Sequence, residues 1–265
     1  MKLSAKKYLL TILGTYPAGR LCPVRNDDTF IVSYPKSGNT WMRFLIANLL
    51  YPDNVSFSNI EDLIPDIYQH SLYFLTFKKS PRILKSHEMC DVRYKKVIYI
   101  VRDPRDVAVS YWHHKVKFHA FDEDYPMSDF VDDFLTGKDI PFGSWAENVN
   151  GWLATNKNNH DFLFLRYEDL IAFPEQEMHK VVAHLGLSSL TGQNIKNAIE
   201  NASFEKLRKL EQEQKNLWSA VKSTRQDKPF VRKGQAGNWK NELPADAVQR
   251  IEFAWGPLMH QLGYF

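Results

Sequence analysis

The chain has 265 residues, of which 44% are hydrophobic, 14% aromatic and 25% charged. This composition excludes a largely disordered protein, because enough apolar surface is present to build an extensive core. The formal net charge of +3 comes from interleaved acids and bases without a long basic block, which argues against a nucleic-acid-binding protein and favours a local anion site.

The first expected element is a short helix near the N-terminus. Lys2, Lys6 and Lys7 precede the apolar stretch 8–13, which is too short to span a bilayer and has no clean cleavage site after it. We therefore expect an amphipathic helix that packs on the protein body, with peripheral contact to a membrane surface as the alternative. No transmembrane segment is expected. Cys22 and Cys90 lie too far apart for a standard metal motif, and they favour a reducing, cytoplasmic location.

Two segments have the pattern of a strand, a loop and a helix. The first begins with the apolar residues 30–33 and leads to a helical pattern over 41–50. The second begins with the continuously apolar residues 97–101 and leads to an expected helix over 106–117. Further expected elements are strands at 82–85 and 162–165, helices at 174–184, 195–217 and 245–262, and a basic loop at 219–239. Strands that alternate with helices predict one α/β domain over residues 1–265, with a central parallel sheet flanked by helices.

The loop after the first strand is an expected anion site. Backbone N–H groups and the helix dipole converge where the carboxyl end of a strand meets a helix N-terminus. Lys36 adds a point charge there, and Gly38 lets the backbone approach a ligand closely. Further hydrogen-bond donors are Ser37, Asn39 and Thr40. Lys36 precedes the glycine instead of following one, so the loop differs from the Walker loop of ATPases.

The sequence Tyr-Pro-Lys-Ser-Gly-Asn-Thr-Trp at residues 34–41 resembles the 5′-phosphosulfate loop of the cytosolic-type sulfotransferases. Residues 142–152 also resemble the segment that precedes the 162–165 strand in this family, so the resemblance covers nearly the whole chain. It implies a P-loop-like nucleotide-binding architecture. It also implies 3′-phosphoadenosine 5′-phosphosulfate (PAPS) as the sulfuryl donor and adenosine 3′,5′-bisphosphate (PAP) as the product.

A second anion site is expected around residue 102. Arg102 ends a strand and Ser110 lies in the following helix, close enough to grip one phosphate from two sides. In the family that the chain resembles, the matching Arg and Ser bind the 3′-phosphate of the donor. The loop containing Arg232, Lys233 and Gly234 resembles the family's Arg-Lys-Gly loop, which closes over the same phosphate.

Two of the charged residues that follow Arg102 invite a plainer interpretation. Arg105 and Asp106 lie at the start of the expected helix, where acidic and basic side chains commonly pair. We therefore expect them to form surface ion pairs without a role in binding.

Three aromatic residues are candidates for the adenine site. Trp41 and Phe204 fall at positions where the family stacks the base, and Tyr167 at a position that contacts it. Ordinary core packing is the alternative for each of them. Ala202 stands where many relatives carry a threonine, so one possible hydrogen bond to the nucleotide is missing.

His87 is the candidate general base. With the period of a strand, Lys85 and His87 point to the same side, toward the crevice above the sheet. Imidazole titrates near neutrality and can accept the proton of an acceptor hydroxyl during in-line attack. Lys36 and Lys85 are expected to stabilise the bridging and sulfuryl oxygens, and no carboxylate cluster suggests a metal site. The rivals are a kinase, which requires a different lysine order and an acidic partner for magnesium, and a binding module, for which His87 is unnecessary.

The acceptor site is expected in loops above the strand ends. The aromatic residues Phe118, Phe121, Tyr125 and Phe142 either line a pocket for a phenol, steroid-like, lipid or glycoside acceptor or fill a helical core. The sequence leaves both alternatives open. The histidines 113, 114 and 119 match no standard metal spacing, so a solvated or acceptor-lining segment is expected there. The Thr-Val dimer motif of many relatives is absent after Lys240, so no oligomeric state is predicted.

Overall fold

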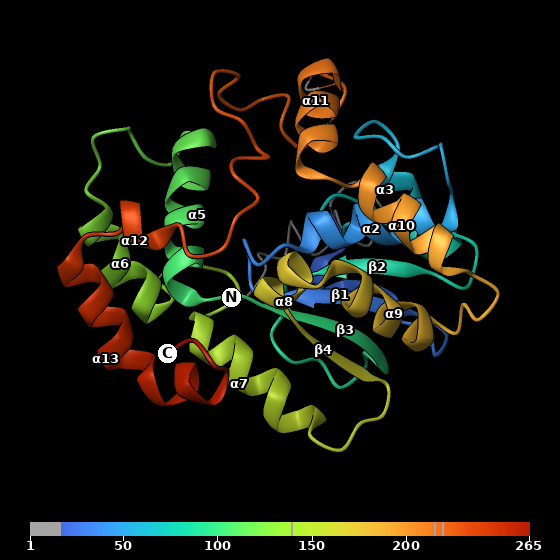
Figure 1. Cartoon of the computed structure of the whole chain (residues 1–265), viewed down its shortest axis with the longest axis horizontal. Helices are drawn as coiled ribbons and strands as arrows, with labels where there is room; N and C mark the ends of the chain where they lie inside the picture. Colours follow the sequence, from blue (N-terminus) through green and yellow to red (C-terminus); the bar gives the residue numbers. More distant parts are fainter. Residues whose placement is uncertain (1–16, 139, 215, 219) are drawn as a thin grey trace.

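Four parallel strands form one sheet at the centre of the protein (Figure 1). The fold comes from a computed structural model that describes residues 17–138, 140–214, 216–218 and 220–265. The strands are β1 (Thr29–Ser33), β2 (Ile83–Ser86), β3 (Lys96–Val101) and β4 (Phe162–Arg166), in the spatial order β2-β1-β3-β4. The predicted α/β fold with a central parallel sheet flanked by helices is confirmed. The expected N-terminal helix lies outside the described residues.

The register of the strands places all four carboxyl ends at one edge of the sheet. Val32 of β1 pairs with Ser86 of β2 on one side and with Tyr99 of β3 on the other. At the last pair of the sheet, Val101 of β3 lies beside Arg166 of β4. Loops that leave parallel strands in register start close together, which is the usual origin of a ligand crevice in such sheets.

The helices include four of the five expected in the described residues, at 41–50, 106–117, 174–184 and 245–262, together with several that were not predicted. They are α2 (Asn39–Leu50), α3 (Ile60–Leu63), α4 (Leu72–Phe77), α5 (Pro104–Lys117), α6 (Met127–Thr136), α7 (Trp145–Asn156), α8 (Tyr167–Ala172), α9 (Pro174–Leu185), α10 (Gly192–Asn201), α11 (Phe204–Gln214), α12 (Trp239–Glu242) and α13 (Ala245–Gln261), after the 3-10 turn η1 (Gly19–Leu21). None of the helices in the described residues is long and apolar enough to cross a membrane.

The single helix expected over residues 195–217 is wrong, because α10 and α11 are separate. Ala202 ends α10, and its backbone carbonyl accepts a hydrogen bond at 2.9 Å from the Trp41 indole on α2. The backbone carbonyl of Ser203 then begins the hydrogen-bonding of α11. A tertiary contact thus interrupts a pattern that looks continuous in the sequence.

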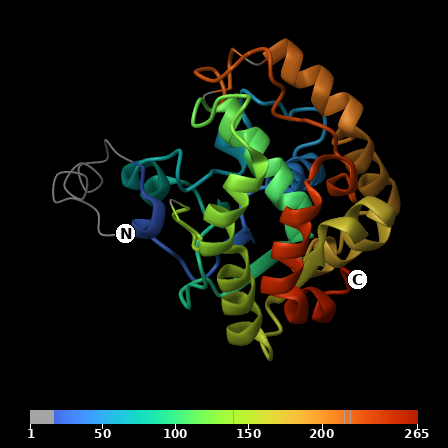
Figure 2. The same cartoon turned by 90° about the vertical axis from the view of Figure 1, so that its left-hand side faces the viewer.

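Each face of the sheet carries its own hydrophobic core. Along β3, Tyr99 and Val101 belong to one buried cluster, while Ile98 and Ile100 belong to the other. Residues 97–101 of this strand are therefore all buried and apolar, because both faces of the sheet are covered. Helices α2, α3, α8, α9 and α10 pack over one face, and α5, α6, α7 and α13 pack over the other (Figures 1 and 2).

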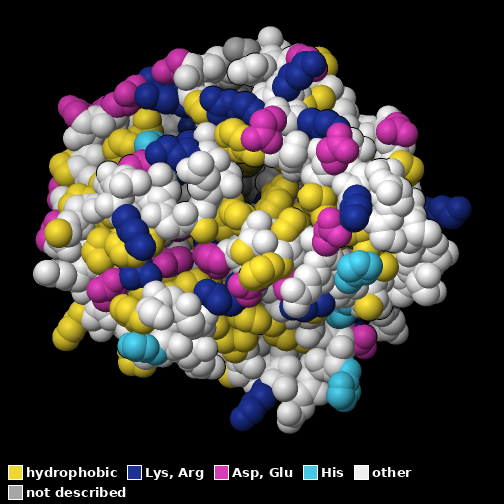
Figure 3. Space-filling model, viewed as in Figure 1, with side chains coloured by type: hydrophobic (Ala, Val, Ile, Leu, Met, Phe, Trp, Pro, Cys, Tyr) yellow, Lys and Arg dark blue, Asp and Glu magenta, His cyan; other side chains and the backbone are white. Residues whose placement is uncertain are grey.

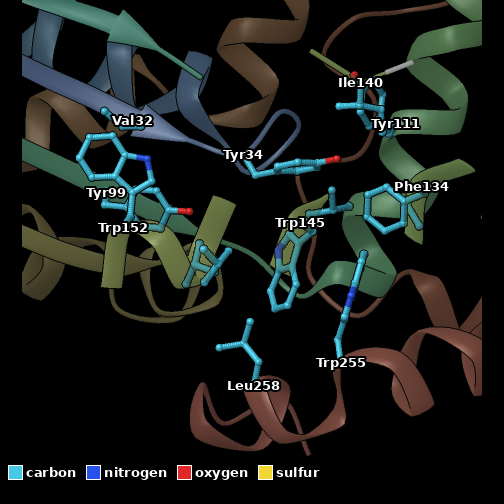
Figure 4. Packing of buried hydrophobic residues seen from close by; sticks show 14 of the residues in the cluster. Val32, Tyr34, Tyr99, Tyr111, Phe134, Ile140, Trp145, Trp152, Trp255 and Leu258 are labelled. Carbon is cyan, nitrogen blue, oxygen red and sulfur yellow. The ribbon is translucent and has the colours of Figure 1, made fainter. Parts of the chain in front are cut away.

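Large aromatic rings dominate the core beneath α7 and α13 (Figure 4). Trp145 is fully buried, and its ring centroid lies 5.3 Å from that of Trp255 on α13. The Trp145 indole N–H also donates a hydrogen bond at 3.1 Å to the backbone carbonyl of Arg102, just beyond β3. This tryptophan therefore connects the core to the edge of the sheet where the strands end.

Replacing Trp145 by alanine is expected to lower the free energy of unfolding by about 3–5 kcal/mol, because it removes a fully buried indole. The matched control is Phe253→Ala on α13, whose side chain is 93% exposed. We expect the control to change stability by less than about 0.5 kcal/mol. Chemical denaturation measures both values, and equal effects in the two variants would contradict the core described above.

Candidate active site

One residue after each strand of the sheet faces a common cavity. Lys36 lies in the loop after β1, His87 directly after β2, Arg102 directly after β3 and Tyr167 directly after β4. All four line a cavity of about 580 Å³. The space-filling view shows a hollow with hydrophobic and basic side chains around it (Figure 3). The parallel register thus collects residues that are far apart in the sequence.

The cavity brings together nearly all of the site residues predicted from the sequence. Besides the four strand-end residues it is lined by Gly38, Asn39, Thr40, Trp41, Lys85, Ser110, Phe204, Arg232, Lys233 and Gly234. Ser37 is the exception, because its side chain is fully buried beneath the loop and is not part of the cavity wall.

The loop after β1 needs its glycine for a steric reason. Gly38 has a φ of 96°, and a Cβ at this position would lie 2.5 Å from the Tyr167 ring. Lys36 also has a positive φ of 70°. Asn39 begins α2, and its side-chain amide donates to the carbonyls of Ile31 and Ser86 at 3.1 and 3.4 Å. This amide therefore ties the loop to strands β1 and β2.

Lys36 lies between an imidazole and a phenyl ring at the floor of the cavity. Its Nζ is 3.5 Å from Nδ1 of His114 and 4.7 Å from the centroid of Phe230. Burial, together with the positive charges of Arg102 and Lys85, lowers the pKa of Lys36 to about 7. The ammonium is therefore poorly compensated, and an anion in the cavity would stabilise its protonated form.

Arg102 is held by backbone carbonyls and retains an unused donor. Its guanidinium donates to the carbonyls of Lys36 at 3.2 Å and Gln235 at 3.0 Å, and it stacks 4.4 Å from the centroid of Tyr167. Its buried Nε has no hydrogen-bond partner among the described residues. Ser110 on α5 lines the same part of the cavity. A buried charged donor without a partner is costly unless a ligand supplies an acceptor.

The loop that carries Arg232 and Lys233 is held in place by buried carboxylates. Glu211 on α11 accepts the backbone N–H groups of Phe230 and Val231, and Asp106 on α5 accepts those of Gly237 and Trp239. Gly234 has a φ of 61°, and a Cβ there would lie 2.7 Å from the Phe204 ring.

The interpretation of Arg105 and Asp106 as surface ion pairs is wrong. Only 5% of Arg105 and 1% of Asp106 is exposed. Arg105 donates to Asp103, Glu252 and the carbonyl of Tyr264, and it stacks on the Trp239 ring. Both charges serve to anchor the C-terminal part of the chain, which a local charge pattern does not reveal.

One hydrogen bond of the His87 ring fixes its tautomer. Nδ1 lies 2.8 Å from the carbonyl oxygen of Ser33, which can only accept, so Nδ1 carries the proton and Nε2 has a free lone pair. Burial, with a further effect of the nearby Lys85 charge, holds the pKa of His87 well below its ordinary value. The ring is therefore neutral near pH 7 and can accept a proton at Nε2.

The wall around His87 contains residues that the sequence did not single out. The Tyr68 ring lies nearly parallel to the imidazole, at a centroid distance of 6.2 Å, and its hydroxyl bonds the backbone N–H of His87 at 3.2 Å. Lys85 is paired with Asp66 at 2.6 Å. Tyr68 and Asp66 belong to an irregular segment without a motif, so no signal in the sequence could have identified them.

The predicted aromatic acceptor cluster divides into two groups. Phe118 and Phe142 line the cavity, and the Phe142 ring lies 5.5 Å from that of His87. Phe121 and Tyr125 stack on each other at 4.2 Å and pack against the core. Core packing therefore applies to Phe121 and Tyr125, whereas Phe118 and Phe142 are cavity-lining residues.

The neighbouring histidines 113, 114 and 119 have separate environments. His114 lines the cavity beside Lys36, and His113 contacts Glu242 at 2.6 Å, while His119 lies at a left-handed turn after α5. Throughout the described part of the chain, no three His, Cys, Asp or Glu side chains gather in a way that could hold a metal ion.

Comparisons with known proteins point to one family. A family model described as sulfotransferase domain matches residues 26–263. Rat sulfotransferase 1E1 is 29% identical over 249 residues, which cover 86% of this chain and 82% of the relative. Mouse sulfotransferase 2B1 is 30% identical over 258 residues, which cover 91% of this chain and 74% of the relative.

Solved structures show the same architecture. Mouse sulfotransferase SULT7A1 complexed with PAP superposes with a TM-score of 0.70 at 25% identity, covering 97% of this chain and 90% of that one. A retinol dehydratase in a complex with retinol and PAP has a TM-score of 0.70 at 22% identity, covering 91% of this chain and 84% of that one. The second likeness concerns the fold alone.

The tautomer of His87 can be tested directly. Nitrogen NMR of the imidazoles is expected to show a His87 ring that is neutral at pH 6.5, protonated at Nδ1 and unprotonated at Nε2. A His87→Gln variant identifies the resonance. A ring that carries protons on both nitrogens at this pH, or a neutral ring protonated at Nε2, would contradict the geometry.

Proposed function

The chain belongs to the sulfotransferase domain family, and on this premise we propose that it transfers a sulfuryl group to a hydroxyl or amine of a small-molecule, lipid or carbohydrate acceptor, with His87 as general base. The enzyme class and the donor follow from the family: it is a sulfotransferase that depends on PAPS and releases PAP. The observation that carries the proposal is a single cavity lined by cations and by the imidazole of His87, whose Nε2 has a free lone pair. The cations are Lys36 with Lys85, Arg102, and Arg232 with Lys233.

The cavity fits a nucleotide with two phosphate groups. Lys36 and the backbone of α2 at Thr40 would hold the 5′-phosphosulfate, where loop, helix dipole and point charge act together. Arg102 has an unpartnered buried Nε, and with Ser110 it would hold the 3′-phosphate under the Arg232 and Lys233 loop. Trp41, Tyr167 and Phe204 line the same cavity and offer ring faces to the adenine.

The residues around His87 would have separate roles during sulfuryl transfer. PAPS supplies the sulfuryl group. The acceptor oxygen or nitrogen attacks sulfur in line, its bond to sulfur forms as the bond from sulfur to the 5′-phosphate oxygen breaks, and its proton passes to Nε2 of His87. Lys36 and Lys85 line the cavity and would stabilise the negative charge that develops on the leaving oxygen. Phe142 and Phe118 form the apolar wall toward the acceptor.

The kinase alternative is disfavoured by the order of the loop residues and by the family membership. We further propose that the chain forms one sulfotransferase domain and acts in the cytoplasm. Support comes from the match over residues 26–263 and from the free thiols Cys22 and Cys90.

Calorimetry with PAP and with ATP, each with and without magnesium, tests the assignment of the donor. We expect PAP to bind without magnesium and more tightly than ATP, because only PAP has a 3′-phosphate for Arg102 and Ser110. A screen of phenols, sterols, sugars and glycolipids with radiolabelled sulfate donor then identifies the acceptor. Magnesium-dependent ATP binding with no response to PAP would overturn the proposal.

His87→Gln is expected to lower kcat for sulfuryl transfer by at least about 100-fold while leaving the affinity for PAP unchanged, because it removes the proton acceptor and no phosphate contact. The matched control is His160→Gln at an exposed position, which should retain full activity. Turnover of the His87 variant at the rate of the control would refute the role of this residue.

The pH dependence of kcat/KM should be bell-shaped. His87 must be neutral to act, and because its pKa is lowered, the acid limb is expected below pH 6.5. Lys36 must be protonated, and because its pKa is lowered to about 7 in the free enzyme, activity should fall as the pH rises through that value. Arginine stays protonated at all these pH values, so Lys36→Arg should lose the alkaline limb, although its maximal rate is lower. If the alkaline limb persists in Lys36→Arg, that limb belongs to another group and the role assigned to Lys36 is wrong.

A further inference from the structure

Four side chains, three from the loop before α12 and one from α5, converge on the carboxylate of Glu242, the last residue of α12. Its Oε1 accepts hydrogen bonds from Arg232 Nη1 at 2.8 Å and Lys233 Nζ at 2.6 Å. The side-chain amide of Asn238 donates to the same oxygen. Oε2 lies 2.6 Å from Nε2 of His113 on α5. Burial alone would raise the pKa of Glu242, but hydrogen bonds from these neighbours hold it well below its usual range, so it is ionised.

The carboxylate of Glu242 offsets the electrostatic repulsion between Arg232 and Lys233. Arg232 and Lys233 are adjacent in a loop and carry like charges on long, rotatable side chains. Without a common counter-ion, the two side chains would separate and sample many rotamers, and binding a phosphate would have to order both. Glu242 orders them beforehand, because both cations bond the same oxygen.

The two cations keep donors for a ligand. Glu242 accepts a hydrogen bond from one nitrogen of the Arg232 guanidinium, and the other N–H groups of this guanidinium do not bond the carboxylate. Lys233 bonds Glu242 and Asn238, which together use part of its ammonium. Both side chains line the cavity. Glu242 therefore binds part of each cation, and the remaining donors are left for a ligand in the cavity.

Glu242 also connects the loop to α5. His113 lies three positions after Ser110, so the two residues are neighbours on the surface of this helix. We propose that Glu242 is a positioning residue that holds Arg232 and Lys233 at a fixed distance from Ser110 and Arg102, and that it thereby sets the preference for a 3′-phosphorylated nucleotide. This inference rests on the proposed function, since it concerns the 3′-phosphate site.

The same contacts allow the opposite role, in which the carboxylate competes with the phosphate for the two cations. The two roles predict opposite signs. If Glu242 positions the cations, neutralising it weakens binding of a 3′-phosphate. If it competes, neutralising it tightens binding, because a repulsive negative charge is removed.

The test is calorimetry of Glu242→Gln with two nucleotides, PAP and adenosine 5′-monophosphate. We expect the affinity for PAP to fall about tenfold, because the order of two side chains is lost, and the affinity for the monophosphate to change by less than about twofold. Binding of the monophosphate also shows that the variant is folded. The matched control is Glu213→Gln on α11, an exposed carboxylate outside the cavity, which should leave both affinities unchanged.

A double-mutant cycle locates the effect. When Arg232 and Lys233 are both replaced by methionine, Glu242→Gln should have no further effect on PAP binding, because the carboxylate then has no cations to position. An unchanged or tighter affinity for PAP in Glu242→Gln overturns the inference, and so does an equal loss for both nucleotides. If the unmodified chain fails to prefer PAP over the monophosphate, the proposed function itself fails, which keeps the two failures distinct.

Discussion

The parallel alignment of four short strands is the constraint on which the rest of the structure depends. Because β1 to β4 run in the same direction and in register, their carboxyl ends meet at one edge, and the residue or loop after each strand enters the same cavity. Lys36, His87, Arg102 and Tyr167 reach it in this way. Both faces of the sheet are covered by packed helices, so the core fixes the positions of these side chains.

Concentrating cations in a partly buried cavity has an electrostatic consequence. Lys36 is buried near other positive charges: burial is the main cause of its lowered pKa, and the positive field that would attract a doubly phosphorylated nucleotide lowers it further. Internal carboxylates moderate this field at defined places: Asp66 pairs with Lys85, and Glu242 with the loop cations.

Much of this arrangement could be predicted from the sequence. The features that could not be predicted share one cause. The strand ends, the loop of Lys36 and Gly38, and His87 are local signals, because apolar runs followed by glycine or charged residues mark where a strand stops. The break between α10 and α11, the burial of Asp106 and the contacts of Tyr68 depend on residues distant in the chain. Glu242 also follows from tertiary packing, since only the fold brings it to His113.

A crystal structure of the complex with PAP tests the central claim most directly, because it shows where each phosphate lies on the edge of the sheet. We expect the 5′-phosphate against Lys36 and the start of α2, the 3′-phosphate between Arg102, Ser110 and the loop of Arg232, and Nε2 of His87 open toward the acceptor side. A nucleotide bound with its phosphates away from these strand ends, or with the imidazole turned out of the cavity, would contradict it.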